Sequence, residues 1–187
     1  MERDTEHLDA AGLKALAHPI RVRMLTALRE SGPATATQLA ARLGESTGTT
    51  SWHLRRLAES GFIEEDRDRG SKRDRWWRPV SRSTAMAVRD FADRPELLAA
   101  VGTYLQSVLE GAFGRAATFL ERADDWSPAW RDAATFSDLS LRLDPAGLAA
   151  LNEAIFALIE EHRAHEPAEG AETVQVQVQS FPRPSAS

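Results

Sequence analysis

The sequence predicts a mainly α-helical fold with a small amount of β-structure, an α+β chain of two domains. Apolar residues recur at helical spacing through the N-terminal third, which indicates several short amphipathic helices. A basic segment with two adjacent tryptophans follows, and its alternating polarity indicates a β-hairpin. The second half carries two long helical patterns and two short alternating segments. A length of 187 residues suits two small domains, which we expect at residues 1–83 and 84–187.

Two helices are expected before the Ser-Gly-Pro sequence of residues 31–33. The first carries Leu13 and Leu16 on one face. Pro19 falls in the first turn of the second helix, where its missing N–H costs nothing because that group has no helical partner. The expected buried face of the second helix consists of Ile20, Met24, Leu25 and Leu28.

A third and a fourth helix follow, with a short link between them. Thr35 and Gln38 have the spacing of a capping box, in which each side chain satisfies an unpaired N–H at the helix start. Gly44 is expected to end the third helix, and Ser46 is a suitable N-cap for the fourth. Two helices joined by so few residues are typical of a helix-turn-helix.

The fourth helix has one core-facing side and one polar side. Its i, i+3, i+4, i+7 pattern predicts a buried stripe of Thr50, His53, Leu54 and Leu57. Small groups at the start of the polar side let that helix end enter a groove deeply, and the arginines further along can reach phosphate. The residues on this side are Gly48, Ser51, Trp52, Arg55 and Glu59, with Arg56 beside them.

A β-hairpin is expected from Phe62 to Val80, with its turn at Gly70-Ser71. The period of two places Trp76 and Trp77 on opposite faces, so that one of them packs on the helices. Aspartates moderate the positive charge of the hairpin, whose basic residues are Arg67, Arg69, Lys72, Arg73 and Arg75. Four helices followed by a basic hairpin have the layout of a winged helix-turn-helix domain.

Residues 84–187 are expected to form an α/β domain that supports dimerisation and effector binding. Residues 1–9 and 79–93 show no strand pattern: the first segment is polar, and the second suggests a partly helical connector. Helices are predicted over residues 93–122 and 144–165. Alternation predicts strands around residues 139–143 and 174–178, and the two strands can pair within one chain or across a dimer.

The composition excludes several classes of protein. Cysteine is absent, which excludes disulfides and thiolate metal sites, and we expect a cytoplasmic protein. No apolar run approaches the roughly 20 residues that span a bilayer, so no membrane partner is expected. The net charge of −5 is uneven: residues 1–83 hold 15 basic and 12 acidic residues, against 8 and 16 in residues 84–187. Nucleophile elbows, phosphate loops and metalloprotease helices are lacking, so neither an enzyme nor a cofactor is expected.

Two groups of side chains allow more than one interpretation. Aromatic residues either line a small-molecule pocket or form ordinary core, namely Tyr104, Phe113, Trp126 and Trp130. His162 and His165 are three residues apart on a helix, a spacing that either holds a metal across a dimer or leaves two solvated histidines, and we expect no metal. We expect His18 to cap a helix and His53 to pack in the core with a hydrogen bond.

Three segments are similar to the ArsR-like family of bacterial winged-helix regulators: "LKALAHPIRVRMLTAL", "TATQLAARLGESTGTTSWHLRRLAESGFIE" and "RDRWWRP". The resemblance covers about residues 10–80. It implies a homodimer that binds double-stranded DNA sequence-specifically, with the second helix of the helix-turn-helix in the major groove and each wing near the flanking backbone. Many members sense metals through cysteine-containing sites, which this chain lacks, and the region after residue 84 is longer than a minimal member needs.

Carried over by position, the resemblance assigns DNA contacts to the fourth helix and the hairpin. The groove residues would be Ser46, Thr47, Thr49, Ser51, Trp52 and Arg55, with Arg56 near phosphate and Gln38 added from the third helix. The wing contacts would be Arg69, Lys72, Arg73 and Arg75. We expect a transcriptional repressor acting as a dimer on an inverted repeat. The alternatives are a regulator whose C-terminal pocket senses an apolar small molecule and a winged-helix module for protein contacts.

Overall fold

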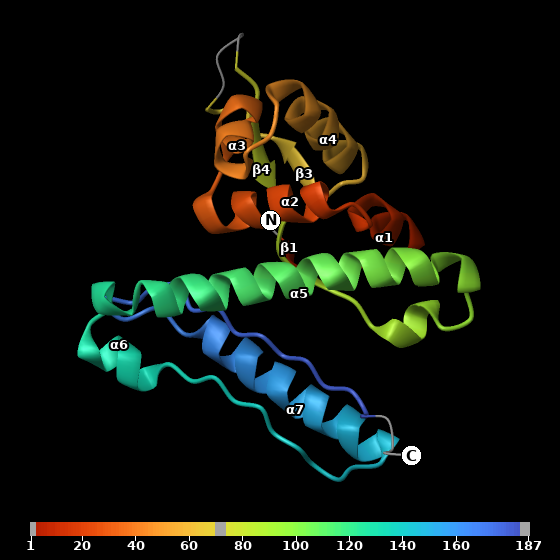
Figure 1. The fold of residues 1–187 in the computed structure, drawn as a ribbon, viewed down its shortest axis with the longest axis vertical. Coiled ribbons are helices and arrows are strands. Elements are labelled where there is room, and N and C mark those ends of the chain that lie inside the picture. Colours follow the sequence, from red (N-terminus) through yellow and green to blue (C-terminus); the bar gives the residue numbers. More distant parts are fainter. Residues whose placement is uncertain (1–2, 70–73, 184–187) are drawn as a thin grey trace. The chain divides into compact units, whose positions relative to one another are not determined.

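The computed structural model describes residues 3–69 and 74–183, and it divides into two compact units, residues 1–121 and 122–187 (Figure 1). The first unit contains β1 (Arg3–His7), α1 (Ala10–Leu16), α2 (Pro19–Ser31), β2 (Ala34–Thr35), α3 (Ala36–Leu43), α4 (Thr47–Glu59), β3 (Ile63–Glu65), β4 (Trp76–Pro79), β5 (Ser81–Ala85), the 3-10 turns η1 (Val88–Phe91) and η2 (Pro95–Leu97), and α5 (Leu98–Glu121). The fold is α+β and mainly helical, as predicted.

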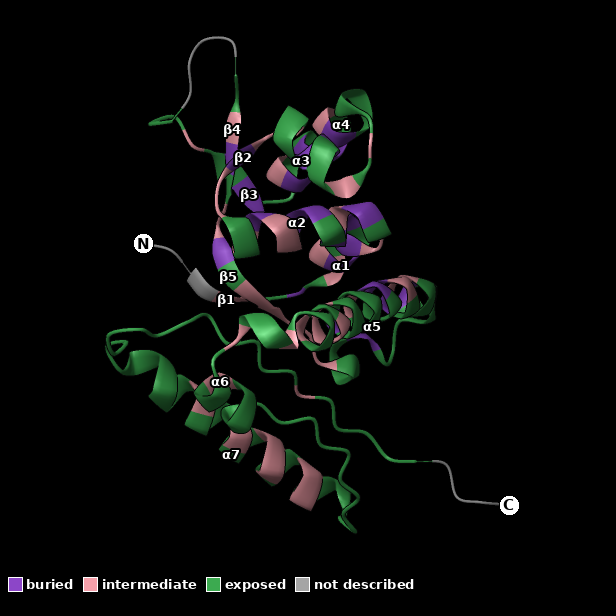
Figure 2. Cartoon of the chain, turned by 60° about the vertical axis from the view of Figure 1, so that its left-hand side comes forward, coloured by how far each residue is buried: buried purple, intermediate pink, exposed green. Residues whose placement is uncertain are grey.

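The core of the first unit lies between its helices and a three-stranded antiparallel sheet of order β2-β4-β3 (Figure 2). Each leucine buried there stabilises the fold by about 1.5–3 kcal/mol relative to an exposed one. The predicted buried stripes of α2 and α4 are confirmed. Side chains that are fully buried include Leu13, Met24, Leu28, Leu39, Leu54, Leu57 and Phe62.

The helix ends also follow the predicted caps. Thr35 Oγ1 accepts a hydrogen bond from Gln38 N at 3.3 Å, and Gln38 Oε1 accepts one from Thr35 N at 2.9 Å. Gly44 takes the left-handed conformation with φ of 69°, which the chain needs to leave α3 and which favours glycine. Ser46 then caps α4, so three residues link the two helices and complete a helix-turn-helix.

The hairpin strands β3 and β4 pair in antiparallel register, with Glu64 opposite Arg78 and Glu65 opposite Trp77. Trp77 is buried and Trp76 is half-buried, so the two rings lie on opposite faces of β4, as predicted. β4 also pairs with β2, which joins the wing to the helices. The predicted turn at Gly70-Ser71 lies outside the described residues.

Two strands in the first unit were not predicted. β1 and β5 pair in parallel, in the segments expected to be a frayed start and a partly helical connector. Their side chains lack apolar alternation, so the pattern gave no strand signal. A buried polar contact holds β5 instead: the guanidinium of Arg29 donates to Ser81 O and to Ser81 Oγ, each at 2.9 Å. Ser81 Oγ in turn donates to Glu6 on β1 at 3.4 Å.

α5 belongs to the first unit because its apolar face packs on α1 and α2. Val101 and Tyr104 are buried there, together with Leu97 from the turn before the helix. The compact unit therefore runs to residue 121, beyond the boundary expected at residue 83. The regular helix starts at Leu98 rather than at residue 93, because the chain from Pro95 first makes a 3-10 turn.

The second unit contains η3 (Ala123–Asp125), α6 (Pro128–Ala133) and α7 (Pro145–Ala164). The predicted helix over residues 144–165 is confirmed, with Asp144 as its N-cap. The strands predicted around residues 139–143 and 174–178 are not formed. Both segments are extended, but no described part of the chain pairs with them, and a strand requires a partner for its N–H and C=O groups.

The second unit has no fully buried side chain among its described residues, and α7 carries only half-buried and exposed ones (Figure 2). Leu139 is 81% exposed and Phe181 is 70% exposed. Apolar surface of this kind marks interaction sites in folded proteins. Within residues 3–69 and 74–183, no helix is both long and apolar enough to cross a membrane.

The contact between Arg29 and Ser81 gives a test of the fold. Ser81→Ala removes one acceptor of a buried guanidinium, so we expect the free energy of unfolding in urea to fall by about 1–3 kcal/mol. Ser60→Ala changes an exposed serine after α4 and should cost less than about 0.5 kcal/mol. Equal stability of the parent and Ser81→Ala would contradict the role given to this contact.

Candidate nucleic-acid interface

The start of α4 is an exposed group of hydroxyls. Ser46 Oγ accepts a hydrogen bond from Thr49 N at 3.1 Å and lies 2.8 Å from Thr49 Oγ1. Thr47, Gly48 and Thr49 are exposed, and Ser51 is half-buried. The N-terminus of a helix carries partial positive charge and free N–H groups, which favours an anionic partner. The small side chains leave this end open to a groove.

The next turn of α4 carries its large side chains. Trp52 is 50% exposed, and its ring meets the ring of His53 edge-on at 4.7 Å. The guanidinium of Arg56 lies 6.0 Å from the Trp52 ring and pairs with Glu59 at 2.8 Å. Arg55 is exposed, and it makes no ion pair or hydrogen bond with the residues that the structure describes. Arg55 is therefore the cation of α4 that is most available to a partner.

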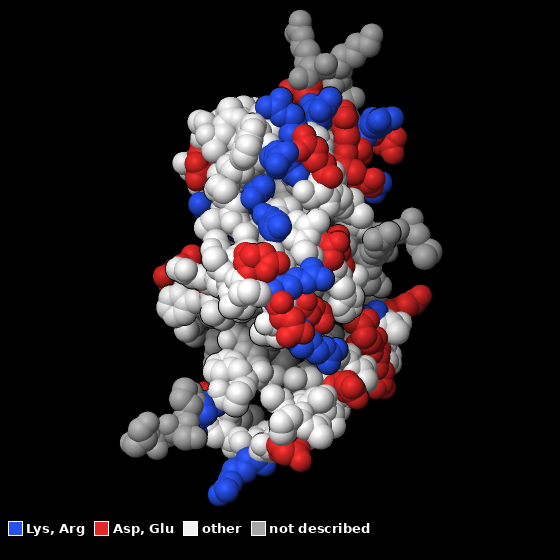
Figure 3. Space-filling view, turned by 90° about the vertical axis from the view of Figure 1, so that its right-hand side faces the viewer, with Lys and Arg blue, Asp and Glu red and all other residues white. Residues whose placement is uncertain are grey.

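Positive charge gathers on this side of the molecule. Figure 3 views the side on which α4 lies in Figure 1, and lysine and arginine atoms collect in its upper part, bordered by aspartate and glutamate. Arg21 of α2, which sequence reasoning did not select, belongs to this region. Burial lowers its pKa, and the charge of Arg56 lowers the pKa further, which shows that the two arginines are close. The signal in the sequence was the segment Ala17-His18-Pro19-Ile20-Arg21, one of the most specific parts of the resemblance, of which Arg21 is the last residue.

The arginines of the wing are paired with carboxylates of the same hairpin. Arg69 lies 3.5 Å from Asp66, and Arg75 lies 3.3 Å from Glu65. Arg75 also lies over the ring of Trp77, at 5.5 Å. Sequence reasoning noted the intervening aspartates but not these pairs. Lys72 and Arg73, which were expected to contact DNA, lie outside the described residues.

Gln38 is placed differently from the other selected residues. Its side-chain oxygen is occupied by the capping box at the start of α3. The side chain is exposed, and its NH₂ group makes no hydrogen bond with the described part of the chain. Gln38 therefore has a structural role and a donor that is still free.

The ring of His18, before α2, contacts the ring of His53 on the buried side of α4, with ring centroids 4.5 Å apart. Burial lowers the pKa of both; the charge of Arg21 adds to the effect on His18, and the charges of His18 and Arg21 add to the effect on His53. His18 is at the N-cap position of α2, but its side chain makes no capping hydrogen bond. His53 is buried as predicted, although the expected hydrogen bond is absent: its Nδ1 has no partner in the described residues. The two rings instead contact each other at an angle of 59°.

The aromatic residues proposed as a pocket lie in both units. Tyr104 is buried in the first unit, whereas Phe113 on the same helix is 77% exposed, so these two do not line one cavity. Trp126 and Trp130 contact each other in the second unit, with centroids 6.4 Å apart. His162 and His165 each bond a backbone oxygen one turn earlier, and the described residues contain no group of three side chains suited to a metal.

Comparison with known proteins supports the assignment of α3 and α4 as a helix-turn-helix. A family model described as a helix-turn-helix domain matches residues 16–66. The HTH-type transcriptional regulator YgaV of Escherichia coli K12 is 41% identical over 59 residues, a match that covers 32% of this chain. The matched region spans 60% of the length of that relative. Residues 16–66 thus form a helix-turn-helix domain.

Solved structures resemble the chain only loosely. A possible transcriptional regulator for arsenical resistance is 24% identical with a TM-score of 0.32, covering 66% of this chain and 96% of its own. An apo mutant of Lactococcus lactis ZitR is 14% identical with a TM-score of 0.32, covering 80% and 85%. RV1404 from Mycobacterium tuberculosis is 17% identical with a TM-score of 0.31, covering 81% and 82%. Superpositions this loose place no individual residue of the chain.

The histidine pair predicts how stability depends on pH. A histidine whose pKa is lowered by folding binds fewer protons in the folded state than in the unfolded state. Its contribution to stability is present above the unfolded pKa of 6.5 and is lost as the pH falls through the lower, folded pKa. We expect the free energy of unfolding to decrease as the pH falls below 6.5.

His53→Gln should flatten this decrease in urea unfolding measured at several pH values, whatever its effect at neutral pH. His165→Gln, which changes an exposed histidine after α7, should keep the slope of the parent. An identical slope in the parent and in His53→Gln would refute the assignment of the titration to the pair.

Proposed function

We propose that this chain is a cytoplasmic transcriptional regulator that binds double-stranded DNA sequence-specifically as a homodimer and acts as a repressor. The observation that carries the proposal is the exposed face of α4, which combines small hydroxyl residues, a helix N-terminus and Arg55 on a helix-turn-helix. The match of residues 16–66 to a helix-turn-helix domain and the likeness to the regulator YgaV support it.

In this proposal, α4 lies in the major groove. An α-helix with its side chains is about 10–12 Å wide, and the major groove of B-DNA is about 12 Å wide. The hydroxyls of Thr47, Thr49 and Ser51 donate to or accept from base edges, and Arg55 makes a two-pronged contact with guanine. Ser46 and Arg56 contact the flanking phosphates, and the Trp52 ring covers a sugar or a thymine methyl group.

The wing contributes affinity that does not depend on sequence. An exposed ion pair contributes at most about 1 kcal/mol, so Arg75 can exchange Glu65 for phosphate at small cost. The side chain of Asp66 is only 12% exposed, so Arg69 exchanges this partner less readily. We assign the same backbone contacts to the NH₂ group of Gln38 and to Lys72 and Arg73, which lie outside the described residues. Because each exchange leaves a carboxylate near the DNA, the wing attracts phosphate less strongly than its arginine count implies.

A dimer matches the apolar surface that the chain leaves uncovered. Leu98 and Leu109 of α5 are 54% and 46% exposed, and the second unit has no buried core of its own. We assign residues 84–187 to dimerisation and residues 1–83 to DNA binding. Two-fold symmetry places two α4 helices about 34 Å apart on one side of the duplex, so the operator is an inverted repeat.

Arg55→Ala tests the assignment of α4. The loss of a two-pronged base contact should weaken binding to the preferred duplex by about 1–3 kcal/mol while affecting a shuffled duplex less. The measurement is fluorescence anisotropy with a duplex from the upstream region of the gene and a shuffled control, across a salt series. Equal affinities of the parent and Arg55→Ala for the preferred duplex would remove Arg55 from the base contacts.

Glu65→Gln tests the exchange of partners in the wing. The substitution releases Arg75 from its ion pair, so binding should tighten for preferred and shuffled duplexes alike. The slope of log affinity against log salt should steepen by up to about 0.9 for each added phosphate contact. Glu153→Gln removes the same charge from α7 and serves as the control. A gain for one duplex alone, or none for either, would contradict a backbone contact by Arg75.

A further inference from the structure

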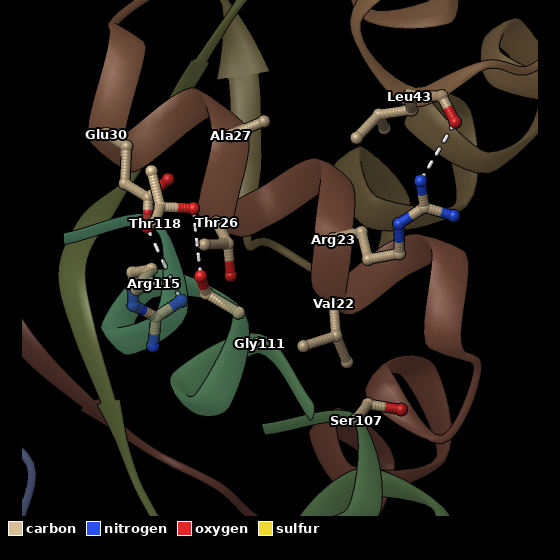
Figure 4. A pocket seen from close by; sticks show the side chains of 11 residues that line it. Val22, Arg23, Thr26, Ala27, Glu30, Leu43, Ser107, Gly111, Arg115 and Thr118 are labelled. Carbon is tan, nitrogen blue, oxygen red and sulfur yellow. Dashed lines mark hydrogen bonds and ion pairs between the residues drawn. The ribbon is translucent and has the colours of Figure 1, made fainter. Parts of the chain in front are cut away.

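A groove of about 650 Å³ lies in the first unit between α2, the end of α3 and the C-terminal half of α5 (Figure 4). Its volume falls in the range of small-molecule sites, about 300–1,000 Å³. Val22, Ala27 and Leu43 give it apolar walls. Gly111 and Gly114 on α5 keep the opposite side open, because they place no side chain in it. None of the aromatic residues considered above contributes to this groove.

Two arginines, Arg23 and Arg115, and one carboxylate, Glu30, line the groove. Arg115 pairs with Glu30 through Nη1 at 3.4 Å, whereas its Nε is buried and has no hydrogen-bond partner in the described residues. A buried donor without a partner costs about 1–3 kcal/mol, so an acceptor that reaches it gains this energy. The Nε atom itself is closed to solvent, so the Arg115 side chain, which is 30% exposed, must turn its Nε–Nη2 edge toward the groove to bind a ligand carboxylate side-on. Arg23 provides the second positive charge.

We propose that this groove binds a small organic carboxylate with an apolar body. The acid group binds Arg115 and Arg23, and the apolar body lies on Val22, Ala27 and Leu43. This assignment follows from the lining: a neutral apolar molecule leaves Nε unsatisfied, and a cation meets two guanidinium groups.

The groove is linked to the turn between α3 and α4 through Arg23. Its Nη2 donates to Leu43 O, the last carbonyl of α3, at 2.8 Å (Figure 4). Its Nη1 lies 3.6 Å from Glu45. These contacts hold the turn that leads from α3 to the N-cap of α4. A carboxylate that draws Arg23 into the groove withdraws this support, so ligand binding weakens DNA binding. This second step rests on the function proposed above, whereas binding of the carboxylate does not.

The test uses the full chain and 4-phenylbutyrate as the probe, with 4-phenylbutan-1-ol as its uncharged counterpart, in isothermal titration calorimetry without DNA. We expect the carboxylate to bind at least tenfold more tightly than the alcohol. Gly114→Leu fills the groove without altering a charge; a β-carbon added there meets no atom within 4 Å, so the helix should tolerate it. Arg115→Gln removes the acid-binding group. Each substitution should weaken binding at least tenfold.

Gly102→Leu is the matched control, because it makes the same change on α5 outside the groove, also with no atom within 4 Å. It should bind the probe as the parent does. Absence of binding to the parent, equal binding of acid and alcohol, or unchanged binding by Gly114→Leu would overturn the site.

The regulatory step is then measured by adding the probe to the DNA anisotropy assay. We expect weaker DNA binding for the parent and for Gly102→Leu, and no effect of the probe on Gly114→Leu. Carboxylate binding with unchanged DNA affinity would overturn the link through Arg23 while leaving the site. If the parent binds no duplex in the absence of the probe, the proposed function fails, and the calorimetry still decides on the site.

Discussion

Burial of one stripe of α4 fixes the orientation of this helix, and the position of every exposed residue on α4 depends on it. Leu54 and Leu57 are fully excluded from solvent against α2, α3 and β3, and Thr50 joins them in the core. Rotation of the helix about its axis would expose these side chains, and each leucine would lose about 1.5–3 kcal/mol. The opposite face is therefore fixed toward solvent. That face carries the hydroxyls and Arg55, so packing of the core determines which residues α4 exposes, and these are the residues that we propose contact DNA.

The same unit combines a firm framework with contacts that are cheap to exchange. The core of α2 and α4 fixes the position of α4, whereas the exposed ion pair of Arg75 with Glu65 on the wing contributes at most about 1 kcal/mol. The turn before α4 depends on Arg23, whose contacts with Leu43 and Glu45 are also close to the surface. We propose that this difference in strength lets a ligand change the turn, and a phosphate change the ion pair of the wing, while the core stays intact.

Local signals in the sequence predicted α3 and α4 well. The stripe ending at Leu57 and the capping box of Thr35 each depend on residues a few positions apart, and periodicity detects such patterns. The pairing of β1 with β5 was missed because it depends on Arg29, whose partner Ser81 is 52 residues away. The strands expected around residues 139–143 and 174–178 are not formed. Alternation around Leu141 predicts that one side of the segment is apolar, but it does not show which strand would pair with it.

Specific DNA binding through α4 is tested by letting the full chain select duplexes from a random pool and sequencing the selected duplexes. If α4 of each protomer reads the major groove, the enriched duplexes will contain an inverted repeat with half-site centres about 10 base pairs apart. The preference will be lost when Arg55 is replaced by alanine. Failure to enrich any sequence over the input pool, even at low salt, would contradict specific DNA reading by α4 and would favour a winged-helix domain used for protein contacts.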